Sequence, residues 1–142
     1  MSDIKVLLVD DEVEFTASMK KVLRSRGFDV KEARDGLVAL SLIAEEHFDV
    51  VVLDVKMPGM DGIRVLAEIK RHSPEISVIL LTGHYSLCED EDAWKTKAYA
   101  CVFKPCPVLD LVKVIAAAAS DKGTESSQSS MNQESPKYFN TR

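Results

Sequence analysis

The chain has 142 residues, of which 46% are hydrophobic and 29% are charged, and its formal net charge is -5 at pH 7. This length suits one folded domain, and the composition excludes a wholly disordered, collagenous or coiled-coil chain. The acidic balance argues against direct nucleic-acid binding, which needs a basic surface. Charged residues interrupt the first apolar run early, so we expect neither a signal peptide nor a membrane span, and a cytoplasmic location.

The first half of the chain alternates apolar runs with helical spacing. Residues 6–9 form an apolar run without polar alternation, which predicts a strand buried on both faces of a parallel sheet. A helix is predicted up to Gly27, a residue type that often ends helices, and a weaker strand follows at residues 28–31. The next predicted helix has Leu37, Leu40 and Ala44 on its core face.

The second half continues the alternation. Strands are predicted at residues 50–53, 78–81 and 101–103, and a helix between the first two carries the apolar stripe Ile63, Leu66 and Ile69. A fourth helix is expected within residues 84–98, with the acidic run 89–92 facing solvent. A fifth helix at about residues 108–119 is expected to bury Leu109, Val112 and Ala116. Strands that alternate with helices predict an α/β fold with five parallel strands.

The composition changes after residue 120. Ser, Gln, Asn and Thr dominate residues 121–142, and apolar residues are too few to offset the entropy of ordering. We predict one folded domain over residues 1–120 and a flexible tail over residues 121–142, with Tyr138 and Phe139 as an alternative docking element. This division leaves no room for a DNA-binding or enzymatic output domain, so output is expected to come from protein contact or from outside the chain.

Polar residues follow four of the predicted strands. Asp10 and Asp11 follow the first apolar run, Asp54 the third, Thr82 the fourth and Lys104 the fifth. In an open parallel α/β sheet, functional groups collect beyond the carboxyl ends of the strands, so these side chains are expected to converge.

The three carboxylates are expected to repel one another and to attract a hard cation. Mg²⁺ prefers oxygen ligands and is typically held by one or two carboxylates together with phosphate oxygens. A carboxylate beside such a metal can act as a nucleophile toward phosphorus, and Asp54 is the best candidate because it ends the most apolar strand. Lys104 and Thr82 would then bind phosphoryl oxygens.

The motifs LLVDDE, VVLDVKMPGMDG, ILLTGH and FKP stand in this order within residues 3–120. This part of the chain resembles the receiver domains of two-component response regulators. The resemblance implies a flavodoxin-like, doubly wound fold with strand order 2-1-3-4-5 and five flanking helices. It implies that Asp54 is the phosphoacceptor, Asp10 and Asp11 the acidic metal pair, Thr82 the switch hydroxyl and Lys104 the phosphoryl-binding lysine.

The resemblance has further implications for the site. The backbone carbonyl of Lys56 would complete the shell of Mg²⁺ or Mn²⁺, and the peptide bond before Pro105 is expected to be cis. The side chains of Lys56 and His84 would flank the phosphoryl group and govern the approach of water.

The resemblance also implies partners. A sensor histidine kinase or a phosphotransfer protein would donate the phosphoryl group, and the domain would assist its own phosphorylation and dephosphorylation without being an enzyme. A downstream protein would bind the face made by the fourth helix, fifth strand and fifth helix. Either a monomer or a phosphorylation-dependent dimer is compatible with the sequence.

Cys101 departs from the family pattern, because most receivers carry Tyr or Phe three positions before the lysine. We expect Cys101 to pack as a small hydrophobic residue and to couple phosphorylation to the output face more weakly or differently. With Cys88 and Cys106 it forms no CxxC pair, so we expect reduced thiols and no catalytic cysteine.

Two other functions stay open. A haloacid dehalogenase-type phosphohydrolase would use Asp10 as its nucleophile, but the run Asp10-Asp11-Glu12 lacks the Asp-x-Asp pattern of that family. A receiver-like interaction module that does not depend on phosphate is the other alternative. No GxGxxG or Walker-type motif is present, which argues against nucleotide binding.

Overall fold

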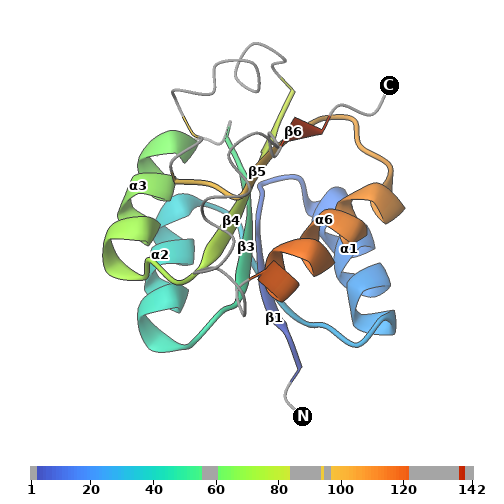
Figure 1. Cartoon of the computed structure of the whole chain (residues 1–142), viewed down its shortest axis with the longest axis horizontal. Coiled ribbons are helices and arrows are strands. Elements are labelled where there is room, and N and C mark those ends of the chain that lie inside the picture. The colour runs from blue at the N-terminus through green and yellow to red at the C-terminus, as the bar shows by residue number, and fades with distance from the viewer. Residues whose placement is uncertain (1–2, 56–60, 84–93, 95–96, 122–137, 140–142) are drawn as a thin grey trace.

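A computed structural model describes residues 3–55, 61–83, 94, 97–121 and 138–139. Strands and helices alternate along most of its length (Figure 1). In chain order they are β1 (Lys5–Val9), α1 (Val13–Ser25), β2 (Asp29–Ala33), α2 (Gly36–Glu45), β3 (Val50–Asp54), α3 (Gly62–His72), β4 (Ser77–Thr82), β5 (Ala100–Phe103), α6 (Val108–Asp121) and β6 (Tyr138–Phe139).

The strands form one parallel sheet in the order β2-β1-β3-β4-β5-β6. The predicted flavodoxin-like order 2-1-3-4-5 is confirmed, and the two-residue β6 adds an outer strand that the sequence pattern did not predict. The chain places β2 on one side of β1 and then places β3, β4 and β5 on the other side. The strand order therefore reverses between β1 and β3, which are neighbours at the topological switch point. In doubly wound sheets, ligands bind just beyond the carboxyl ends of the strands at this point.

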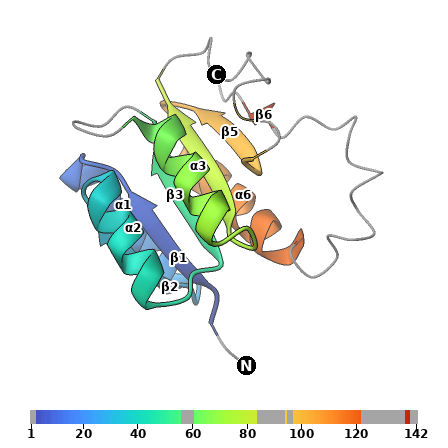
Figure 2. The same cartoon turned by 90° about the vertical axis from the view of Figure 1, so that its left-hand side faces the viewer.

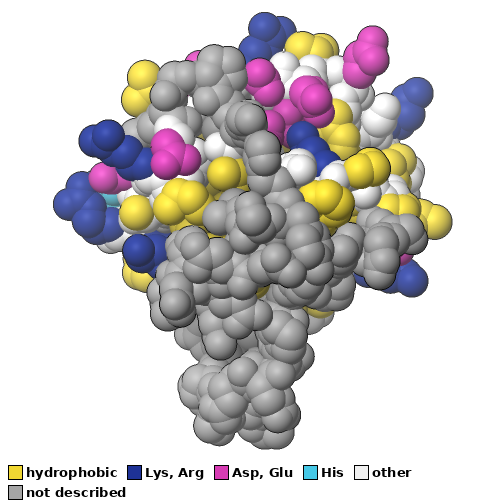
Figure 3. Space-filling model, turned by 90° about the horizontal axis from the view of Figure 1, so that it is seen from above, with side chains coloured by type: hydrophobic (Ala, Val, Ile, Leu, Met, Phe, Trp, Pro, Cys, Tyr) yellow, Lys and Arg dark blue, Asp and Glu magenta, His cyan; other side chains and the backbone are white. Residues whose placement is uncertain are grey.

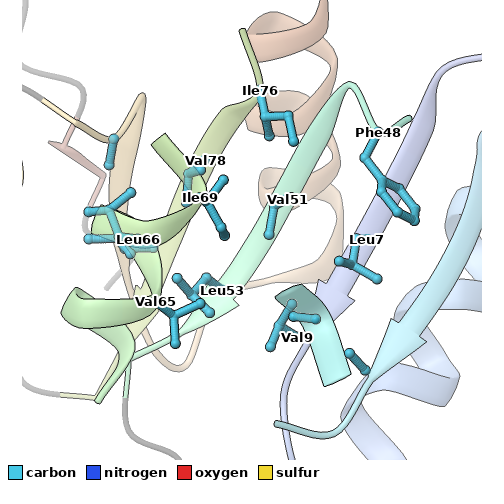
Figure 4. Packing of buried hydrophobic residues seen from close by; sticks show 14 of the residues in the cluster. Leu7, Val9, Phe48, Val51, Leu53, Val65, Leu66, Ile69, Ile76 and Val78 are labelled. Atoms are coloured by element: carbon cyan, nitrogen blue, oxygen red, sulfur yellow. The ribbon is translucent and has the colours of Figure 1, made fainter. Parts of the chain in front are cut away.

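Helices cover the sheet on both sides. In Figures 1 and 2, α2 and α3 lie on one face, and α1 and α6 lie on the other. Alternate residues of each strand therefore enter different core clusters: Leu7 and Val51 pack on the α2/α3 side (Figure 4), whereas Val6 and Leu8 pack on the α1/α6 side. This double burial explains the unbroken apolar runs of the strands.

Two helices turn a partly different face to the core than we predicted. Leu37 in α2 is 70% exposed and Leu109 in α6 is 53% exposed. Ala44 and Ala116 are exposed as well. Val112 is buried as predicted, and Leu40 packs partly buried against the core. The other buried positions are Gly36 and Ala39 in α2, and Leu111, Val114, Ile115 and Ala118 in α6. Both helices are apolar on nearly every side, so spacing alone cannot select the face that packs on the sheet.

The end of α1 follows the prediction for Gly27. This glycine has a φ of 95°, a left-handed conformation that residues with a Cβ rarely adopt. Its N–H donates to the Arg24 carbonyl (3.0 Å), and the Phe28 N–H donates to the Leu23 carbonyl (3.1 Å). These two bonds form a Schellman motif, which ends the helix and leads the chain directly into β2.

The region predicted to hold a fourth helix lies outside the described residues, apart from Trp94 and residues 97–98. Trp94 is buried in the core cluster on the α2/α3 side. The four helices that the structure does describe are too short or too polar to cross a membrane.

Candidate functional site

The polar residues that follow the strands converge at one edge of the sheet, as predicted. Asp10 directly follows β1, Asp54 ends β3, Thr82 ends β4 and Lys104 directly follows β5. These four strands are consecutive neighbours and run parallel, so their carboxyl ends meet at a single edge. Figure 3 looks down on this edge and shows acidic side chains gathered there.

The carboxylates of Asp10, Asp11 and Asp54 are close enough to share a cation. One oxygen from each lies within 4.8 Å of the others. Oxygens on opposite sides of a bound Mg²⁺ are about 4.2 Å apart, so a small adjustment of the side chains would suffice. Asp10 and Asp54 are 4% and 5% exposed, whereas Asp11 is open to solvent. The residues thus fit Mg²⁺, with two buried carboxylates on the protein side and room for water on the other.

Lys104 supplies the positive charge of the site. Its Nζ lies 3.2 Å from Oδ2 of Asp10 and 3.8 Å from Oδ2 of Asp54. Burial is the largest single influence on the pKa of Lys104 and lowers it, but the attraction of Asp10 and Asp54 and the hydrogen bonds to Glu12 and Asp10 together raise it above its usual value. The side chain is therefore an ammonium group at neutral pH.

Glu12 is a site residue that the sequence analysis missed. Its carboxylate accepts a hydrogen bond from Lys104 (3.2 Å), and its backbone N–H donates to Oδ1 of Asp10 (2.9 Å). Phe15 also contributes, because the Lys104 ammonium lies 5.2 Å from its ring centroid. Both residues sit just after the acidic pair, and that proximity was the only signal for them in the sequence.

Gly62 is a second residue whose role only the structure reveals. A Cβ on this glycine would lie 2.5 Å from the Cα of Val55, the residue that follows Asp54. The Gly62 N–H donates to the Val55 carbonyl (3.1 Å), and Asp61 caps α3 by accepting from the Ile63 N–H (3.2 Å). The start of α3 is thus held tightly against the backbone beside Asp54.

Thr82 is fully buried at the end of β4. Its carbonyl accepts a hydrogen bond of 2.7 Å from the Lys104 N–H, which ties the ends of β4 and β5 together. The peptide bond between Lys104 and Pro105 is cis, as the resemblance implied. Lys56 and His84, predicted as a carbonyl ligand and as residues that flank the phosphoryl group, lie outside the described residues.

Cys101 packs as predicted. It is fully buried and belongs to the same core cluster as Trp94. Cys101 and Cys106 are both free thiols. Burial, with a smaller contribution from the Asp110 carboxylate, raises the pKa of Cys106 to about 11, so this thiol is a poor nucleophile at neutral pH.

The fold and this edge together define a flavodoxin-like α/β protein whose acidic pocket suits a hard cation and a phosphoryl group. The family model of the response regulator receiver domain matches residues 6–116. The chain belongs to this family and is a signalling domain of the two-component type.

Individual relatives agree with this assignment. Transcriptional regulatory protein ZraR of Escherichia coli (strain K12) is 38% identical over 103 residues, which are 72% of this chain and 23% of ZraR. Sporulation initiation phosphotransferase F of Bacillus subtilis (strain 168) is 33% identical over 111 residues, which are 78% of this chain and 90% of that protein. The chain therefore spans less than a quarter of one relative and most of the other.

A solved structure is similar as well. The response regulator protein TrrA of Thermotoga maritima, determined in complex with Mg²⁺-BeF, has a TM-score of 0.74 and 29% identity to this chain, and the match covers 81% of this chain and 98% of TrrA.

Proposed function

We propose that this receiver domain accepts a phosphoryl group on Asp54 with Mg²⁺ bound beside it. The observation that carries the proposal is the position of the buried Asp54 carboxylate, within 4.8 Å of the oxygens of Asp10 and Asp11 and 3.8 Å from the Lys104 ammonium. A nucleophile, a set of metal ligands and a phosphoryl-binding cation thus meet at one point. The Mg²⁺-BeF complex of the Thermotoga relative supports the same chemistry.

In the proposed reaction, an Asp54 oxygen attacks the phosphorus of a phosphohistidine. The new O–P bond forms as the P–N bond breaks, and the electron pair stays on the imidazole nitrogen of the donor. Mg²⁺ held by Asp10, Asp11 and Asp54 would offset the charge on the phosphoryl oxygens. Lys104 would exchange its carboxylate partners for these oxygens, and the Thr82 hydroxyl would bind them from β4. The domain would in this way assist both formation and hydrolysis of its own acyl phosphate.

The partners follow from this chemistry. The donor would be a sensor histidine kinase or a phosphotransfer protein in the cytoplasm. A downstream protein would bind the face around β5 and α6 after phosphorylation. Because Cys101 occupies the core where receivers usually carry an aromatic switch, we propose that coupling to this face is weaker or differently built. The described domain would act through protein contact, with no direct role of its own in binding nucleic acid.

The test is phosphorylation by acetyl phosphate with Mg²⁺, followed by intact mass measurement. The wild-type chain should gain one phosphoryl group, and Asp54→Asn should gain none. Glu46→Gln, a carboxylate change at the opposite edge of the sheet, serves as the matched control and should react like the wild type.

Two results would contradict the proposal. A wild-type chain that stays unmodified would favour an interaction module that works without phosphate. Hydrolysis of a small phosphate ester that is lost in Asp10→Asn but kept in Asp54→Asn would favour the phosphohydrolase mechanism.

A further inference from the structure

The C-terminal strand β6 lies on the outer edge of β5 (Figures 1 and 2). The two strands are parallel, with Cys101 opposite Tyr138 and Val102 opposite Phe139. An edge strand presents backbone donors and acceptors that can pair with another chain. In this protein, its own tail fills part of that edge.

β6 is not the third part of a regular βαβ unit. The connections β3–α3–β4 and β5–α6–β6 both lead to the next strand in the same direction across the sheet. However, α3 covers one face of the sheet and α6 the other (Figure 1). Two such connections cannot have the same hand, and right-handed connections are nearly universal in βαβ units. β6 is therefore an added strand that lies outside the regular βαβ pattern of the domain.

The backbone of β5 identifies the group that faces β6. Backbone N–H groups along a strand point alternately to its two neighbours. The Lys104 N–H donates to the Thr82 carbonyl on β4. The Tyr99 N–H also donates to β4, at the Val78 carbonyl (2.7 Å), but Tyr99 precedes β5 and this bond is one residue out of the β4–β5 register. Within the paired strand, the alternation counted from Lys104 turns the Val102 N–H to β4 and the Cys101 N–H to β6. The two amides thus report separately on the inner and the outer edge of β5.

The tail leaves the domain close to this edge. α6 ends at Asp121, whose carboxylate accepts a hydrogen bond of 2.6 Å from the Tyr99 hydroxyl, and Tyr99 directly precedes β5. Between Asp121 and Tyr138 there are 16 residues. Because the segment belongs to the same chain, its pairing with β5 is intramolecular, and linked segments meet their sites at effective concentrations in the millimolar range. Two residues of strand pairing can therefore suffice within one chain.

We propose that residues 138–139 are an intramolecular ligand of the β5 edge. The tail occupies, by strand addition, a docking site for an extended segment, and an external partner that uses this edge must displace the tail. The proposal does not depend on phosphorylation of Asp54.

Amide hydrogen exchange measured by NMR on the full chain tests the proposal. Proline in β6 removes the N–H that this strand needs to pair with β5, so the double variant Tyr138→Pro/Phe139→Pro should release β6 from the edge. The Cys101 amide is then exposed on a free edge and should exchange about tenfold faster or more, as expected for the loss of about one hydrogen bond. The Val102 amide should be unchanged. A double variant elsewhere in the tail, Ser127→Pro/Ser129→Pro, should behave like the wild type.

Several results would overturn the proposal. Equal Cys101 exchange in the wild type and the Tyr138→Pro/Phe139→Pro variant would show that the tail does not protect this edge. Equal acceleration at Val102 would show general loosening of the sheet. Protection that rises with protein concentration would assign the edge to the tail of a second copy.

A free peptide covering residues 134–142 provides the second test. It should shift the Cys101 amide resonance of the Tyr138→Pro/Phe139→Pro variant at millimolar concentration, and shift it much less in the wild type, whose site is already filled. The same peptide with proline at positions 138 and 139 should cause no shift. Equal shifts in both proteins, or no shift in either, would refute the proposal.

Discussion

Charged side chains gather both at the amino ends and at the carboxyl ends of the strands, but the two ends of the sheet balance charge differently. Near the amino ends of the strands, Glu46 lies between Lys5 (2.8 Å) and Lys31, so one carboxylate meets two ammonium groups. At the carboxyl ends, in the described part of the chain, Lys104 meets the carboxylates of Asp10, Glu12 and Asp54, and Asp11 adds a fourth.

This difference separates a structural ion pair from a functional site. The Glu46 cluster is complete without a ligand, and hydrogen bonds from Lys31 and Lys5 lower the pKa of Glu46. The site at the carboxyl ends of the strands retains excess negative charge. Two of its carboxylates, those of Asp10 and Asp54, are buried. Buried excess charge is costly unless a cation offsets it, and this cost supports the proposed Mg²⁺ site.

The largest expected effect is on Mg²⁺ affinity. Asp10→Asn and Asp54→Asn each remove a proposed direct ligand, so affinity should fall on the order of 100-fold or more, since even loss of an outer-shell partner costs 10–100-fold. Glu46→Gln should bind Mg²⁺ like the wild type. Isothermal titration calorimetry measures the Mg²⁺ affinity of all three variants. An equal loss of affinity in Glu46→Gln would show that Mg²⁺ binding does not depend on the carboxylates at the carboxyl ends of the strands in particular.

Removal of the central lysine should be the most damaging single change to stability at the site. Lys104→Met leaves Asp10 and Asp54 buried without a cation and should lower the free energy of unfolding by about 2–4 kcal/mol. Because Mg²⁺ replaces the missing charge, its addition should restore part of the loss. Urea unfolding with and without Mg²⁺ measures both effects. A loss that Mg²⁺ leaves unchanged would mean that packing, not charge, explains the role of Lys104.

The site edge also depends on a close backbone contact. Gly62→Ala would force a Cβ against the Val55 backbone and should cost about 1–3 kcal/mol of stability, with weaker Mg²⁺ binding because Asp54 precedes Val55. Gly83→Ala is the matched control, since a Cβ there meets no atom within 4 Å. Thermal unfolding of the two variants should differ clearly, and equal melting temperatures would contradict the tight-contact interpretation.

The smallest expected effect is on the stability contributed by Glu46, near the amino ends of the strands. The pKa of Glu46 is lowered in the folded chain, so its ion pairs stabilise the fold at neutral pH and lose this contribution as the pH falls through the folded-state pKa. Glu46→Gln should therefore melt slightly below the wild type at pH 7, and the difference should vanish at acidic pH. A difference that persists below pH 3 would need another cause.

Some parts of the molecule followed from local chemistry. The buried runs predicted the five strands, and the residues after them predicted Asp10, Asp54, Thr82 and Lys104 as neighbours, because parallel strands end at a common edge. Glu12 and Gly62 were not predicted, since an exposed glutamate and a helix-start glycine have many roles. Glu12 matters because it contacts Lys104, which is 92 residues away in the chain. Gly62 matters because it contacts Val55, which is seven residues away.

The order of apolar and polar residues alone establishes the α/β class, the five-strand pattern and the polar set after the strands, because these depend on local periodicity and on where each run ends. Tertiary packing decides the remainder. It selects the buried faces of α2 and α6, which are apolar on almost every side, and it pairs Lys104 with Glu12. It also places Tyr138 and Phe139, two aromatic residues in a polar tail, on the edge of β5. These features depend on contacts between distant segments, which local patterns do not encode.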